Sequence, residues 1–94
     1  MAKIVWTRKE LNDLKKIYNY IREDSPFYAA RYTNKLFNKV EILETFPESG
    51  KMVPEKNDPN IRELIEGNYR IFYKYKPQKN IAILRIHHSA KLLR

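Results

Sequence analysis

The sequence contains no cysteine, and this absence excludes two kinds of structure. A chain of 94 residues without cysteine can form neither a disulfide framework nor a thiolate metal site. Small proteins without disulfides are typical of a reducing compartment, so we expect this one in the cytoplasm. The two histidines, His87 and His88, are adjacent, and adjacent residues of a strand point to opposite faces. They cannot chelate one ion together, so we expect no metal site and no cofactor.

Long apolar runs are absent as well. No stretch approaches the roughly 20 apolar residues that a membrane-spanning helix needs. Charged residues interrupt residues 1–14, which therefore lack the apolar segment of a secretory signal. We expect no contact with a membrane. The length suits one domain and not two, so we expect a single domain over residues 1–94.

Negative charge is scarce relative to positive charge. The sequence has 19 lysines and arginines against 11 aspartates and glutamates, a net charge of +8 at pH 7. Such an excess indicates an acidic partner, which is a nucleic acid, an anionic surface or an acidic protein. A basic surface that only keeps the protein soluble explains the charge about equally well. No recognised motif for reading RNA or DNA is present, which disfavours a generic nucleic-acid-binding module.

The first half of the sequence predicts two helices. Thr7 and Glu10 have the spacing of a capping box, and Ser25 is the cap of a second helix. The predicted helices cover residues 7–24 and 25–46, and the short link between them requires an antiparallel hairpin. Their apolar stripes are Leu11, Leu14, Ile17, Tyr18 and Ile21 in the first helix, and Ala29, Thr33, Leu36, Phe37, Val40, Ile42 and Leu43 in the second.

The second half of the sequence changes to the two-residue period of strands. Strands are predicted over residues 2–6, 61–65, 69–76 and 80–87, with a loop over residues 47–60. The nearly all-apolar residues 81–86 predict a strand that is central or covered on both faces. The order strand, helix, helix, strand, strand, strand defines an α+β fold. In it, the helical hairpin covers one face of an antiparallel sheet, which the N-terminal strand joins.

Several sequence blocks, taken in order, resemble one family of proteins. These are Trp6 with the first apolar stripe, Ser25 and Pro26 followed by Ala29, and residues 46–50, 61–64, 68–73 and 83–88. Over nearly the whole chain, this set resembles the RelE/ParE superfamily, and within it the ParE-like toxins of plasmid-stabilisation systems. The resemblance implies the same α+β fold. It also implies a toxin component of a type II toxin–antitoxin system, which arrests growth until a cognate antitoxin neutralises it.

The superfamily has two kinds of target. RelE-like members cleave mRNA on the ribosome, whereas ParE-like members poison DNA gyrase and are not nucleases. RNA cleavage needs cations for the phosphorane charge and groups that move protons, and Arg70, Arg85 and His87 are the catalytic candidates if this chain is a nuclease. RelE-like proteins often carry a C-terminal tyrosine, and none follows His88; Arg62 stands where they tend to show several bases. These departures favour gyrase inhibition without enzymatic activity, with mRNA cleavage as the alternative.

Binding of the antitoxin and the target is expected at basic residues near the last strands. The expected binding residues are Arg62, Arg70, Phe72, Arg85, Lys91 and Arg94. Phe72 is the aromatic residue expected at the surface. Tyr69 and Tyr73 are expected on the same side of the strand as Ile71, packed against the helices, because successive side chains of a strand point to opposite faces. For Arg70, an ion pair with Glu63 and a contact with a partner are about equally expected.

Overall fold

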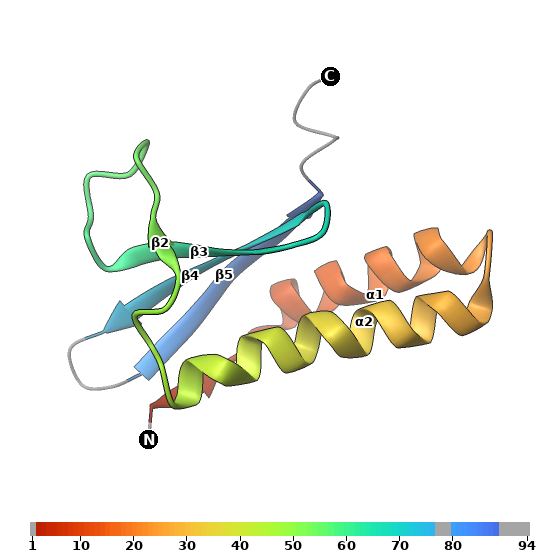
Figure 1. The fold of residues 1–94 in the computed structure, drawn as a ribbon, viewed down its shortest axis with the longest axis horizontal. Helices are drawn as coiled ribbons and strands as arrows, with labels where there is room; N and C mark the ends of the chain where they lie inside the picture. Colours follow the sequence, from red (N-terminus) through yellow and green to blue (C-terminus); the bar gives the residue numbers. More distant parts are fainter. Residues whose placement is uncertain (1, 77–79, 89–94) are drawn as a thin grey trace.

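The structure is a computed structural model that describes residues 2–76 and 80–88. Two α-helices form one layer and a five-stranded sheet forms the other (Figure 1). The elements are β1 (Lys3–Val5), α1 (Arg8–Arg22), α2 (Pro26–Glu41), a 3-10 turn η1 (Ile42–Glu44), β2 (Lys51–Met52), β3 (Ile61–Glu66), β4 (Tyr69–Lys76) and β5 (Asn80–His88). This arrangement confirms the predicted α+β fold with a helical hairpin on one face of a sheet.

Both helices begin at the predicted caps. The Glu10 carboxylate accepts hydrogen bonds from the backbone N–H of Thr7, at 3.0 Å, and from the Thr7 hydroxyl. Ser25 Oγ accepts a backbone N–H of the first turn of α2 at 3.2 Å. The second helix ends earlier than predicted: regular α-helix stops at Glu41, and the chain tightens into η1, as is common at helix C-termini.

The sheet has the strand order β1-β5-β4-β3-β2. Strands β2 to β5 pair antiparallel in sequence order, whereas β1 pairs in parallel with β5. The sheet is therefore mixed at the β1 edge. Parallel pairing needs a long crossover connection, which the helical hairpin and strands β2 to β4 provide between β1 and β5. The short strand β2 lies within the segment predicted as a loop.

The hydrophobic core lies between the helix layer and the sheet. Alternation along β4 places Tyr69, Ile71 and Tyr73 on the helix side, where all three are buried as predicted. Helix α2 contributes Leu36 and Val40, which are fully buried, and α1 contributes Ile17. The predicted apolar stripes are buried only in part, since a two-layer fold leaves the outer side of its helices in solvent. Leu11, Phe37 and Ile42 are 47%, 40% and 45% exposed.

A β-bulge in β5 changes which of its side chains face the core. The register between β4 and β5 shifts by one residue, and Leu84 is the extra residue. Ile83 is buried on the helix side before the bulge, and Ile86 is buried on that side after it. Arg85 and His87 consequently face away from the helices. The strand is internal to the sheet, as predicted, with its helix-facing side buried.

Candidate functional site

The face of the sheet opposite the helices, here called the open face, brings together four of the expected site residues. Arg70 and Phe72 alternate with the buried Ile71 along β4. In the register with β5, Arg70 is opposite His87 and Phe72 is opposite Arg85. Opposed residues of antiparallel strands have Cβ atoms about 4.5–5.5 Å apart. The four side chains therefore form one contiguous group across two strands.

Residues 53–56 form a wall beside this group. A cavity of about 310 Å³ lies between the wall and the strands, and its lining includes Lys56, Glu55 and all four residues of the group. Val53 fixes the wall to the sheet, because its side chain is only 2% exposed. Lys56 adds a cation that the sequence did not predict for this site. A loop has no periodicity from which the direction of its side chains could be read.

The segment before this wall is tied to the helix side of the sheet. Tyr73 Oη donates to the carbonyl oxygen of Pro47 at 2.8 Å and accepts the N–H of Gly50 at 2.9 Å. Arg62 lies opposite Tyr73 in the sheet, and its Nη1 donates to the carbonyl oxygen of Gly50 at 2.9 Å. Its Nη2 also lies 3.7 Å from the Glu48 carboxylate. Arg62 thus holds the loop, and the structure does not bring it to the open-face group.

Arg70 has charged and aromatic neighbours. Its Nη2 forms an ion pair with Oε2 of Glu63, and its Cζ lies 4.9 Å from the centre of the Phe72 ring. Glu63 is only 4% exposed. The hydrogen bond that Arg70 donates to the Glu63 carboxylate raises the pKa of Arg70 above its usual value, so the guanidinium stays charged at any physiological pH. Of the two alternatives left open for Arg70, the ion pair with Glu63 is present, and it balances the charge of Arg70 locally.

The remaining expectations concern the C-terminal residues, metals and membranes. Lys91 and Arg94, two of the expected binding residues, lie outside the described residues. Within residues 2–76 and 80–88, no three or more acidic, histidine or cysteine side chains are placed to hold a metal ion. Neither helix in the described part of the chain has the length and apolar character needed to cross a bilayer.

Sequence comparison assigns this chain to a known class of protein. The family model of the ParE toxin of the type II toxin–antitoxin system parDE matches residues 4–93. Toxin RelE2 of Caulobacter vibrioides is 33% identical over 92 residues, which are 98% of this chain and 100% of that protein. These matches define a toxin of the RelE/ParE superfamily. Within it, the chain belongs to the ParE toxin family of type II toxin–antitoxin systems.

Two solved structures share the fold. A chain of the chromosomal ParDE toxin–antitoxin system of P. aeruginosa is similar with a TM-score of 0.76 and 30% identity, and the match covers 94% of this chain and 96% of that one. A chain of the RelBE2 toxin–antitoxin complex of Mycobacterium tuberculosis has a TM-score of 0.59 and 19% identity, over 93% of this chain and 96% of that one. At that identity the second match supports the fold alone.

Proposed function

We propose that this toxin arrests bacterial growth in the cytoplasm by inhibiting DNA gyrase through protein contact, and that a cognate antitoxin neutralises it. Two observations support the assignment to a toxin–antitoxin system. The matching family model describes the ParE toxin of parDE systems, and the similar P. aeruginosa chain comes from a ParDE toxin–antitoxin system. The observation that carries the choice of gyrase is the ion pair between Arg70 and the buried Glu63.

This ion pair disfavours nuclease chemistry at the open face. Cleavage of RNA requires a cation aimed at the charge that develops on the phosphorane. Arg70 already faces a carboxylate, and a phosphate drawn to it would also meet the negative charge of Glu63. A protein-contact inhibitor has no such requirement and needs only a basic surface of suitable shape. Arg85, which is exposed, and Lys56 provide such a surface beside the paired Arg70.

Ribosome-dependent mRNA cleavage is the second candidate. Arg85 and His87 are grouped with Arg70 on adjacent strands, so two cations and a residue able to move protons share one cavity. The 33% identical relative also carries the name RelE2. The two candidates make opposite predictions for purified protein.

The first test uses purified protein in two assays. We expect it to inhibit supercoiling by gyrase or to trap the gyrase cleavage complex, and to leave ribosome-bound mRNA uncut. The variant Arg85→Glu reverses an exposed charge of the open face and should weaken gyrase inhibition about tenfold. Lys9→Glu reverses an exposed charge on α1, in the helix layer, and should leave inhibition unchanged.

Codon-specific cuts in ribosome-bound mRNA, without any effect on gyrase, would instead support the nuclease as the function of this toxin. If His87 and Arg85 carry that reaction, His87→Ala and Arg85→Ala should each slow cleavage roughly 10²–10³-fold.

The antitoxin is tested in cells. Induction of the toxin gene alone should arrest growth, and co-expression of the neighbouring reading frame should relieve the arrest. Normal growth at high levels of folded protein would count against the toxin assignment.

A further inference from the structure

The solvent-facing side of α1 carries a single row of cations and amides. The residues of this row, here called the basic row, are all exposed: Arg8, Asn12, Lys15, Asn19 and Arg22. At about 100° per residue, the five positions fall within a sector of about 80° on the helix, and the ends of the row lie about 21 Å apart along its axis. The row therefore covers the full length of α1. It belongs to the helix layer, on the side of the molecule away from the open face (Figure 1).

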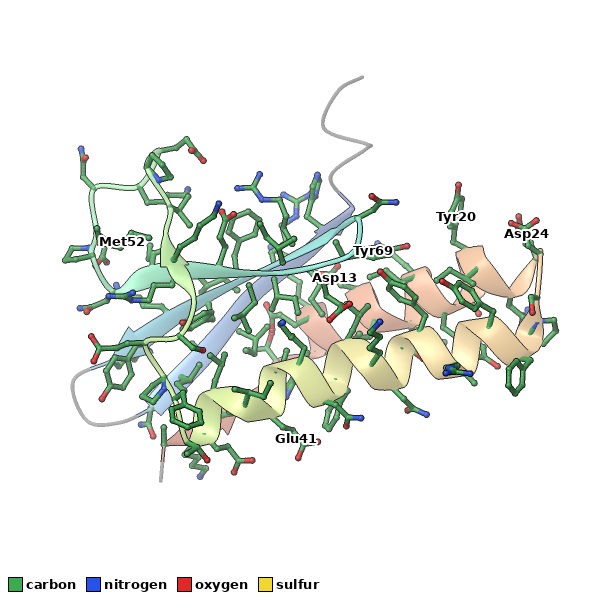
Figure 2. The ribbon with its side chains drawn as sticks, in the orientation of Figure 1. Asp13, Tyr20, Asp24, Glu41, Met52 and Tyr69 are labelled. Atoms are coloured by element: carbon green, nitrogen blue, oxygen red, sulfur yellow. The ribbon has the colours of Figure 1, made fainter. Side chains whose placement is uncertain are left out.

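The acidic residues of α1 point away from the basic row. Glu10 is buried, and its carboxylate accepts hydrogen bonds from Thr7. Asp13 lies toward the sheet, and its Oδ2 accepts the backbone N–H of Ile86 at 3.4 Å (Figure 2 labels Asp13, between the helix layer and the sheet). Both carboxylates are engaged on the inner side of the helix, so neither balances the charge of the row.

The cations of the basic row have no acidic partner elsewhere in the described part of the chain. Within residues 2–76 and 80–88, ion pairs are made by Lys35, Arg62, Arg70 and Lys74, and none is made by a cation of α1. Inside the helix, the positions three and four residues from each cation of the row carry asparagine or an apolar residue. No pair along the helix therefore neutralises the row.

Helix stability does not account for the basic row. Arg8 stands at the first position of α1, next to Lys9, at the positive end of the helix dipole, where a cation is unfavourable. Unpaired cations along one face of a helix also repel one another. The charge of the row therefore indicates an anionic partner.

We propose that the basic row is a docking surface for duplex DNA, which it holds by the phosphate backbone without reading the sequence. Arginine, lysine and asparagine side chains all donate hydrogen bonds to phosphate and sugar oxygens. The major groove of B-DNA is about 12 Å wide and admits an α-helix, and a row about 21 Å long passes roughly six base pairs. Backbone binding of this kind needs no sequence-reading motif.

The chemistry of the basic row favours duplex DNA over other anions. A helix that binds a membrane surface inserts its apolar face, whereas the apolar side of α1, with Ile17, is part of the core. Single strands are bound largely by stacking of bases on aromatic side chains, and the row has none. Duplex RNA has a deep and narrow major groove that side chains cannot read.

DNA binding is a property separate from gyrase inhibition, because the basic row and the open face lie on different layers of the molecule. Weak, sequence-independent binding lets a protein slide and hop along DNA. It would keep the toxin on the polymer that gyrase also works on, and only this consequence rests on the proposed function.

The test is fluorescence anisotropy of a labelled duplex of about 20 base pairs, titrated with purified toxin at several salt concentrations. We expect a dissociation constant on the order of 10–100 µM at about 20 mM salt, and a slope of about −2.7 for the logarithm of the binding constant against that of the salt concentration, from three cations at about 0.9 each. A variant that combines Arg8→Gln, Lys15→Gln and Arg22→Gln should bind at least about tenfold more weakly and lose most of this slope.

The matched control removes three exposed cations from the sheet. It combines Lys3→Gln, Lys51→Gln and Lys76→Gln in β1, β2 and β4, so it has the same net charge as the variant of the basic row. Its affinity should stay within about twofold of the wild type, because none of these residues lies on α1. In the wild-type toxin, DNA should also protect Lys15, but not Lys51, from chemical acetylation.

Three results would overturn the proposal. Equal losses in the two triple variants, with Lys15 and Lys51 acetylated alike, would mean that DNA responds to net charge alone. Stronger competition by single-stranded DNA, duplex RNA or vesicles of anionic lipid, at equal phosphate concentration, would mean that the partner is wrong. No DNA binding at low salt, combined with weaker gyrase inhibition by the variant of the basic row, would assign the row to an acidic surface of gyrase. Undiminished supercoiling in the presence of folded toxin that binds DNA would contradict the proposed function and leave this inference in place.

Discussion

A single hydroxyl joins the core to the loop beside the open face. The ring of Tyr73 is fully buried, and its hydroxyl lies between the carbonyl of Pro47 and the N–H of Gly50. Tyr73→Phe keeps the ring but leaves both backbone groups without this partner, so it should lower the free energy of unfolding by about 1–3 kcal/mol. Chemical denaturation measures the change, with Tyr28→Phe at an exposed position as control. A loss no larger than that of the control would contradict this role.

The buried tyrosines also predict an alkaline limit to stability. Burial raises the pKa of Tyr73, Tyr69 and Tyr32 above the usual value of 10.0. In the unfolded chain these groups ionise near pH 10, so the folded state keeps the protons longer. The stability they give is complete below that pH and is lost as the pH rises through the folded pKa values. Unfolding followed from about pH 8 to pH 11 should show this loss, and Tyr73→Phe should reduce it; an equal loss in the variant would refute the assignment.

At the scale of elements, the β3–β4 turn depends on one glycine. Gly67 has φ +58°, and a Cβ there would collide with the hydroxyl of Tyr32, which donates to the carbonyl oxygen of Glu66 at 3.1 Å. Gly67→Ala should therefore destabilise the protein by about 1–3 kcal/mol, from backbone strain and the collision together. In a Tyr32→Phe background the collision is removed, so thermal unfolding should show a smaller loss from the same substitution. Equal losses in both backgrounds would rule out the collision.

The elements could be read from the sequence because their signals are local. The caps at Thr7 and Ser25 and the alternation along β4 depend on neighbouring residues, and they predicted the helices and the strands. The bulge at Leu84 and the parallel pairing of β1 depend on distant strands, so no local pattern indicates them. For the same reason the sequence indicated neither Lys56 at the open face nor Asp13 at the edge of β5.

At the scale of the whole molecule, β5 borders two cavities, one beside α1 and one on the open face. Arg85 and His87 line both the cavity at the edge of β5 and the cavity of the open face. A partner bound in either cavity would therefore cover part of the surface proposed to contact gyrase.

Gyrase supercoiling, titrated with purified toxin and then with antitoxin, tests the central claim most directly. The proposal predicts that wild-type toxin inhibits supercoiling, and that antitoxin at about equal concentration restores it. Undiminished supercoiling in the presence of folded toxin, with codon-specific cleavage of ribosome-bound mRNA in the parallel reaction, would contradict it.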